Sequence, residues 1–196
     1  MSRVRQPADV RRRALVEAAL ASLVEHGAEG ASVRVIAARA SVSPALLAYH
    51  FGSKEGLLVA AYRHLSEELA IAGDEALAAA GDDPRARLRA FLAAGFQPRF
   101  LTADRLTARV ALWSIAATEP ALHAVHAELY ARYRAALKEL IGDLAPGTPV
   151  DDRLVFATSA LLDGLWLERS AGERGYDVDA MLDTCVALVE AYLGVR

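Results

Sequence analysis

The hydrophobic residues of this chain recur at three- and four-residue intervals over most of its length, the periodicity of amphipathic helices. In residues 9–27, for example, Leu15, Ala18 and Leu23 return to one face. Breaks in the pattern carry glycine and proline, as at residues 81–84. The pattern predicts helices over residues 9–27, 33–40, 44–51, 53–80, 84–98, 103–118, 120–144, 151–171 and 178–193.

Composition supports an all-α fold of about nine helices. Hydrophobic residues make up 54% of the 196 residues and aromatic residues only 7%, so alanine, leucine and valine must supply most of the core. Alanine and leucine are strong helix formers, whereas the residues that favour strands are comparatively few. No internal repeat interrupts the helical pattern.

Residues 32–54 hold the most informative pattern, two short helices joined by a tight turn. Ser32 can cap the first helix. Ser43 can cap the second, with Pro44 at the first helical position, where its missing N–H costs nothing. The second helix is expected to end at Phe51. This outline is that of a helix-turn-helix, whose second helix enters the major groove of DNA.

Charge is distributed unevenly along the chain. Residues 1–54 carry eight lysines and arginines against four acids, a net charge of +4, whereas residues 55–196 carry 14 against 21, a net charge of −7. A basic end on an acidic body fits phosphate contact by that end alone, although a chance excess of solvated arginines would look the same. We therefore expect a helix-turn-helix DNA-binding domain in residues 1–54 and a ligand-binding and dimerisation domain in residues 55–196.

The sequence offers no recognisable catalytic, cofactor-binding or metal-binding set. The common phosphate-binding, dinucleotide-binding, hydrolase and zinc-protease motifs are absent, so we expect no enzyme and no cofactor. His123 and His126 lie three residues apart with glutamates nearby. They lack a further ligand at metal spacing and fit a solvated helix face better than a metal site.

Cys185 is the only cysteine, so no disulfide can form within the chain. It lies among apolar residues and is interpreted as a packing residue, not as a redox sensor. The sequence shows no signal peptide and no apolar run of about 18 residues. We expect the protein in a reducing cytoplasm, without a membrane partner.

The chain resembles the TetR family of one-component transcriptional regulators. The likeness spans residues 11–58 and rests on a set of matching positions: Gly27, Val33, Ile36, Ala37, Ala40, Val42, Ser43, Leu47, His50, Phe51, Lys54 and Leu57. The chain departs from the family pattern at Ser41, where glycine is usual, at Ala45, where glycine or proline is common, and at Ala48, where tyrosine is frequent. These departures concern which operator is read, not whether DNA is bound.

Two later segments are similar to the ligand domain of the choline-responsive repressors of betaine biosynthesis. They are residues 111–114, which include Trp113, and residues 161–167, which include Asp163 and Trp166. The resemblance implies a regulator whose C-terminal domain binds a small-molecule effector.

The predicted DNA contacts divide into positioning and reading residues. Phosphate contacts are expected from Ser32, Arg34, Ser43, Tyr49, His50 and Lys54. Base contacts are expected from Pro44, Ala45 and Leu46, which can touch thymine methyl groups but cannot make bidentate hydrogen bonds to guanine. Tyr49 and His50 could instead be packing residues, and Lys54 could be an ordinary surface lysine.

The candidate effector-binding residues are aromatic, apart from one carboxylate. Tryptophan faces attract cations, and aromatic cages recur in sites for quaternary ammonium ions. Asp163 precedes Trp166 by three positions, so the two share a helix face and can offer a carboxylate and a ring to one cation. Trp113, Tyr130, Tyr133, Phe96 and Phe100 are the further candidates around an effector cavity. The competing interpretation is that both tryptophans simply fill an alanine-rich core.

The last two predicted helices have wide apolar faces that would suit a four-helix interface in a homodimer. Their apolar residues are Leu154, Leu161, Leu162, Leu165, Met181, Leu182, Cys185, Leu188, Val189 and Tyr192. A dimer is also what a palindromic double-stranded operator requires, because two recognition helices must reach successive major grooves.

The sequence thus predicts a DNA-binding transcriptional regulator, most simply a repressor that a small molecule, such as a cationic metabolite, releases from its operator. The alternative is a DNA-binding regulator or scaffold with no small-molecule effector. Activation instead of repression also stays open.

Overall fold

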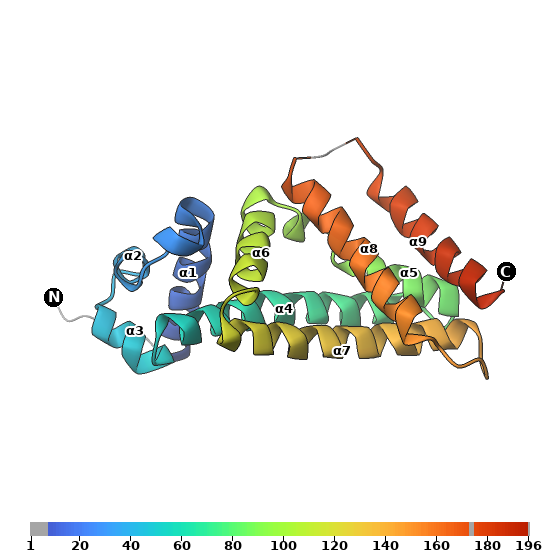
Figure 1. Cartoon of the computed structure of the whole chain (residues 1–196), viewed down its shortest axis with the longest axis horizontal. Coiled ribbons are helices and arrows are strands. Elements are labelled where there is room, and N and C mark those ends of the chain that lie inside the picture. The colour runs from blue at the N-terminus through green and yellow to red at the C-terminus, as the bar shows by residue number, and fades with distance from the viewer. Residues whose placement is uncertain (1–7, 173–174, 196) are drawn as a thin grey trace. The chain divides into compact units, whose positions relative to one another are not determined.

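The computed structural model of the protein describes residues 8–172 and 175–195, and every regular element in that part of the chain is helical (Figure 1). The described elements are nine α-helices and one 3₁₀ helix: α1 (Ala8–Gly30), α2 (Val33–Arg39), α3 (Pro44–Phe51), α4 (Lys54–Ala79), α5 (Pro84–Ala94), η1 (Pro98–Phe100), α6 (Ala103–Ala116), α7 (Pro120–Leu144), α8 (Asp152–Ser170) and α9 (Val178–Leu193). The predicted all-α class with about nine helices is confirmed.

Capping residues begin the two short helices where the sequence predicts. Ser32 Oγ accepts a hydrogen bond from the Val35 N–H at 3.3 Å, and Ser43 Oγ accepts one from the Leu46 N–H at 3.2 Å. Pro44 occupies the first turn of α3. Because each hydroxyl satisfies a backbone donor that the helix itself leaves unpaired, these caps fix where α2 and α3 start.

Two helix ends differ from the prediction by more than two residues. Gly27 does break α1, with φ 67° and ψ −174°, but a short helical stretch follows and carries α1 to Gly30. α5 ends at Ala94, before the expected residue 98. The reason is Pro98, which has no N–H to donate and disfavours helical backbone at Gln97, whose ψ is 146°.

The turn between α2 and α3 is closed by two backbone hydrogen bonds. The Ser41 N–H donates to the Ala38 carbonyl at 3.0 Å, and the Val42 N–H donates to the Ala37 carbonyl at 2.9 Å. This is the Schellman arrangement, in which the residue after the helix cap adopts a left-handed conformation and is usually glycine. Ser41 holds that position with φ 54°, alone among the non-glycine residues that the structure describes. Its side chain costs the turn about 1–2 kcal/mol.

The chain divides into two compact units. The first unit comprises the described residues up to Leu65 together with Thr107–Ala127, and the second comprises Ser66–Leu106 together with the described residues from Glu128 onward. Fully buried leucines and isoleucines of α1 to α4 form the core of the first unit, and those of α5, α7 and α9 form much of the core of the second. The expected boundary at residue 54 stays a prediction. Within the described residues, no helix is both long and apolar enough to span a bilayer.

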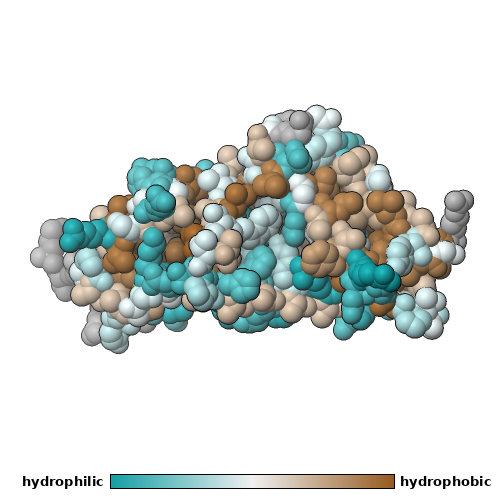
Figure 2. Space-filling view, viewed as in Figure 1, coloured by the Kyte–Doolittle hydropathy of each residue, from teal (hydrophilic) through white to brown (hydrophobic). Residues whose placement is uncertain are grey.

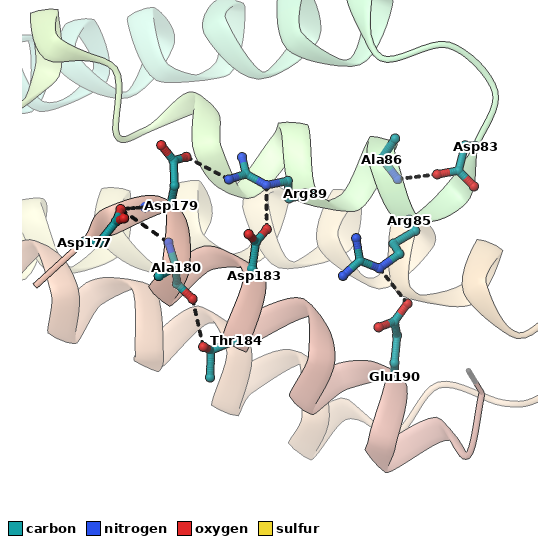
Figure 3. A network of polar contacts seen from close by, with 10 residues as sticks. All are labelled: Asp83, Arg85, Ala86, Arg89, Asp177, Asp179, Ala180, Asp183, Thr184 and Glu190. Atoms are coloured by element: carbon teal, nitrogen blue, oxygen red, sulfur yellow. Dashed lines mark hydrogen bonds and ion pairs between the residues drawn. The ribbon is translucent and has the colours of Figure 1, made fainter.

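An ion-pair network joins α5 to α9 in the second unit (Figure 3). Arg89 donates to Asp179 at 2.7 Å and to Asp183 at 2.8 Å, and Arg85 donates to Glu190 at 3.1 Å. The hydrogen bond to Asp179, followed by that to Asp183, raises the pKa of the Arg89 guanidinium. The carboxylates of Asp179 and Asp183 are largely exposed, so their pairs with Arg89 contribute little free energy. Its consequence is geometric, since three pairs along one helix fix the register of α9 on α5.

The apolar faces of α8 and α9 have an inner and an outer side, which corrects the predicted interface. Leu154, Leu162, Leu182, Cys185 and Val189 are buried inside the second unit and cannot meet a second copy. The exposed large apolar residues of these two helices form what we call the outer apolar face: Phe156, Leu161, Leu167, Leu188 and Tyr192, each between 38% and 58% exposed. Figure 2 shows apolar surface gathered where α8 and α9 lie. Periodicity could not separate the two sides because both are apolar.

Burial of Cys185 leads to a prediction about thiol reactivity. The residue is 2% exposed, and burial raises the pKa of its thiol to about 11, so thiolate is scarce at pH 8. We expect reaction with a chromogenic disulfide reagent at pH 8 to be on the order of 100-fold slower in the folded than in the unfolded protein. Because the folded pKa exceeds the unfolded value of about 8.5, this group's stabilising contribution is complete below that pH and is lost as the pH rises towards 11. Equal rates with and without denaturant would contradict the assignment.

Candidate functional site

α3 presents its N-terminal residues and one aromatic ring to solvent. Pro44 and Ala45 are exposed, Leu46 and His50 are half-buried, and Tyr49 is 83% exposed. The Tyr49 ring meets the His50 ring edge-on, with centroids 5.3 Å apart. An aromatic side chain this exposed makes almost no packing contribution, so the packing interpretation of Tyr49 loses its support, while its phosphate contact stays a prediction.

The inner side of α3 is anchored at two points. Leu47 is 1% exposed and sits in the core of the first unit. Arg12, from α1, donates from Nη1 to the His50 carbonyl at 3.2 Å and lays its guanidinium 4.5 Å from the centre of the Phe51 ring. A cation at these last carbonyls also interacts favourably with the helix dipole. Sequence reasoning missed Arg12, because only the fold brings α1 against the end of α3.

The remaining predicted phosphate contacts lie at helix starts. Ser32 and Ser43 use their oxygens as acceptors in the two caps, which leaves each O–H able to donate outward. Arg34 is exposed on the first turn of α2. Unpaired N–H groups at these helix starts favour anions, so the geometry is compatible with phosphate contact.

Lys54, at the start of α4, has a structural partner. Its Nζ donates to the Ala28 carbonyl at 3.1 Å, which ties α4 to the segment that follows the break in α1. An ammonium has three donors, so this bond does not preclude a phosphate contact. The DNA-binding role of Lys54 stays a prediction.

Two polar contacts bind α4 to its neighbours in the first unit. His64 Nε2 lies 3.0 Å from Glu17 Oε1 of α1, and the Tyr62 hydroxyl lies 2.7 Å from His126 Nδ1 of α7. His126 therefore does not lie on a solvated face as the sequence suggested. Its half-buried ring has a partner instead. No group of three potential metal ligands occurs among the described residues.

In the second unit, four of the candidate effector residues make contacts with one another at α8. The Tyr130 hydroxyl donates to Asp163 Oδ1 at 2.8 Å. Trp166, 8% exposed, stands one helical turn further along α8, and its ring lies 6.0 Å from the Phe96 ring, tilted by 59°. The predicted sharing of one helix face by Asp163 and Trp166 is thus seen in the structure.

Two other candidates in this unit have other neighbours. Tyr133 stacks on Phe91 with centroids 5.4 Å apart. Phe100 is buried under Arg99, whose guanidinium lies 4.8 Å from the ring centre. The structure does not show these two rings joining Trp166, and their effector role stays a prediction.

Trp113 belongs to the first unit, whereas the other candidates belong to the second. The Arg109 guanidinium lies 5.8 Å from the centre of its ring, and its indole N–H is buried without a hydrogen-bond partner among the described residues. The effector role of Trp113 stays a prediction.

Arg134 is a second residue that sequence reasoning missed. Its guanidinium lies 5.2 Å from the centre of the Tyr130 ring and 4.8 Å from that of Phe156. Arg134 thus lies against the Tyr130 ring, while the Tyr130 hydroxyl bonds to Asp163; the effector role of Tyr130 stays a prediction.

Comparison with known proteins gives the family. Residues 15–61 match the profile of bacterial regulatory proteins of the tetR family, and residues 84–194 match the C-terminal domain of BetI-type transcriptional repressors. The HTH-type transcriptional regulator BetI of Burkholderia thailandensis is 33% identical over 190 residues, 96% of either chain.

Solved structures agree over the whole length. A transcriptional regulator of Pseudomonas aeruginosa PAO1 superposes with a TM-score of 0.88 at 34% identity, over 97% of this chain and 93% of that one. A regulator of Saccharomonospora viridis, crystallised in complex with choline, gives 0.73 at 26% identity, over 93% and 96%. The expectation of a non-enzymatic DNA-binding regulator is confirmed, and the chain belongs to the TetR family of transcriptional regulators, with a BetI-type C-terminal domain.

Proposed function

We propose that this protein is a homodimeric repressor that leaves a palindromic operator when a small quaternary ammonium ion, of which choline is the example, binds in its C-terminal domain. The observation that carries the effector class is the Tyr130–Asp163 hydrogen bond beside Trp166. A held carboxylate and a large ring on one helix face supply charge attraction and cation–π attraction to the same ligand.

The likeness to a choline-bound regulator supports the same class. Quaternary ammonium ions cannot donate hydrogen bonds through N–H, so they are recognised by aromatic rings and by negative charge. Asp163 is half-buried, where its charge is less screened than on the surface. The negative net charge of residues 55–196, −7, also favours a cationic effector.

The dimer proposal rests on the outer apolar face. Five large apolar side chains exposed on two adjacent helices are more than scattered surface residues, and a two-fold axis between them would bury each against its counterpart. Two copies would present two α3 helices to DNA, as two half-sites require.

Release follows from linked equilibria. An effector that binds only the conformer with wrongly spaced recognition helices lowers the population that can bind DNA. In the first unit, the Glu17–His64 and Tyr62–His126 contacts couple α4 to α1 and α7, so a shift of α4 would be passed to the helix that anchors α3. A preference of a few kcal/mol for one state suffices.

A thermal-shift experiment tests the effector class. Choline at about 100 times its dissociation constant should stabilise the protein by about 2.7 kcal/mol and raise its melting temperature by several degrees. Its neutral carbon analogue, 3,3-dimethylbutanol, should not. Asp163→Asn keeps the shape and an acceptor for Tyr130 but removes the charge, so choline should bind at least about tenfold more weakly.

Asp143→Asn is the matched control. Asp143 is exposed on α7, so this substitution removes the same charge elsewhere in the second unit. Full choline stabilisation of Asp163→Asn, or equal stabilisation by the neutral analogue, would contradict the cation site. DNA binding that no cation, lipid or aromatic metabolite alters would favour the alternative, a regulator or scaffold without an effector.

A further inference from the structure

One buried hydroxyl of α8 has no partner. Of the three buried polar residues in the described chain, Ser22 and Thr158 each donate to the carbonyl four residues earlier, at 2.7 and 2.8 Å. Ser159 is 1% exposed, yet its Oγ makes no hydrogen bond to any described residue. Buried polar groups are nearly always paired, so an exception in a ligand-binding domain points to a partner that arrives from outside.

The position of Ser159 relates it to the candidate effector site. Ser159, Asp163 and Trp166 stand at positions i, i+4 and i+7 of α8, so they lie in one stripe along the helix. The stripe therefore offers a hydroxyl, a carboxylate and an indole ring in succession. Four residues of helix rise separate the hydroxyl from the carboxylate by about 6 Å along the axis.

We infer that Ser159 is the specificity-determining residue of this site, and that it selects ammonium effectors carrying a hydroxyl group a few bonds from the nitrogen. This inference rests on the proposed cation site and adds the residue that recognises the hydroxyl end of the effector. The cation lies against Asp163 and Trp166, and the effector hydroxyl pairs with Ser159 Oγ. The ammonium group stands off from Asp163 and the effector hydroxyl stands off from Ser159 by their contact distances, which take up much of the 6 Å. The ammonium group and the hydroxyl of the effector must therefore be joined by a short link.

A hydroxyl fits the stripe better than a carboxylate. A carboxylate on the effector would accept from Ser159 equally well, but it would lie one helical turn from the negative Asp163 and be repelled. An analogue that lacks the hydroxyl gains no hydrogen bond here, because Ser159 then stays unpaired as in the ligand-free protein.

The experiment compares choline with ethyltrimethylammonium, which is choline without its hydroxyl, by calorimetric titration of the full-length protein. The wild-type protein should bind choline about tenfold more tightly. In Ser159→Ala the two ligands should bind equally, and the melting temperature without ligand should rise by about 2–4 °C, because an unpaired buried hydroxyl has been removed. Thr158→Val is the matched control, since it removes a neighbouring hydroxyl that is already paired; it should retain the preference.

The outcomes separate this inference from the proposed function. If both cations bind the wild-type protein equally, or if Ser159→Ala keeps the preference, the role of Ser159 is overturned while the cation site stands. A fall in the melting temperature of ligand-free Ser159→Ala would show that its hydroxyl is already satisfied, for instance by water, and would overturn the role as well. If neither cation binds the wild-type protein, the cation site fails and this inference fails with it.

Discussion

Replacing Tyr49 by alanine is expected to weaken operator binding about 100-fold while leaving the melting temperature unchanged within about 1 °C. The ring is 83% exposed, so its removal costs the fold almost nothing. A hydrogen bond to a charged phosphate is worth about 1.5–3 kcal/mol, and a dimer loses two of them. The measurement is fluorescence anisotropy with the duplex that the wild-type protein enriches from a randomised library, at one fixed salt concentration.

Tyr49→Phe separates the hydroxyl from the ring. If the hydroxyl contacts phosphate, phenylalanine should be nearly as weak as alanine. Ile71→Ala is the control, because Ile71 is an exposed apolar residue of α4 in the other unit and should bind DNA normally. Wild-type affinity in Tyr49→Ala would remove this residue from the DNA interface. Lys54→Ala is a less informative test, because it also breaks the contact with Ala28.

Introducing a charge at Leu188 should convert the dimer to a monomer. Leu188 is 55% exposed on α9, so glutamate fits the single chain, but at a two-fold interface two carboxylates would be buried among apolar side chains. We expect Leu188→Glu to weaken self-association more than 100-fold and to abolish tight operator binding. Light scattering behind gel filtration at micromolar protein should give the mass of one chain.

Ile71→Glu is the matched control, since it places the same charge on an apolar residue of α4, 49% exposed, that is not part of the outer apolar face. It should remain dimeric. A dimeric Leu188→Glu protein with normal DNA affinity would refute the outer apolar face as the interface. A monomeric Ile71→Glu protein would move the interface to α4.

The sequence predicted local features well because their physical causes are local. The serine caps of α2 and α3 and the proline at the start of α3 act on backbone groups three residues away at most. The same holds for Asp163 and Trp166, whose spacing alone places them on one face. The order and class of the helices followed from such signals.

Contacts across helices could not be predicted from one sequence. The pairing of Arg12 with α3, of Tyr130 with Asp163 and of Arg134 with Phe156 depends on how distant segments pack. The orphaned hydroxyl of Ser159 is also invisible in sequence, since a serine in a helix ordinarily bonds to its own backbone. The inner and outer sides of α8 and α9 were indistinguishable for the same reason.

The turn at Ser41 is closed by backbone groups alone, so the exposed residues of α3 can be substituted without disturbing the turn. Since no side chain of α3 takes part in those two hydrogen bonds, the angle at which the helix emerges does not depend on what its outer positions carry. Evolution or design can therefore replace Pro44, Ala45 and Tyr49 while the geometry of the turn between α2 and α3 is retained. Related regulators can therefore come to recognise different operators while keeping the same backbone of α2, the turn and α3.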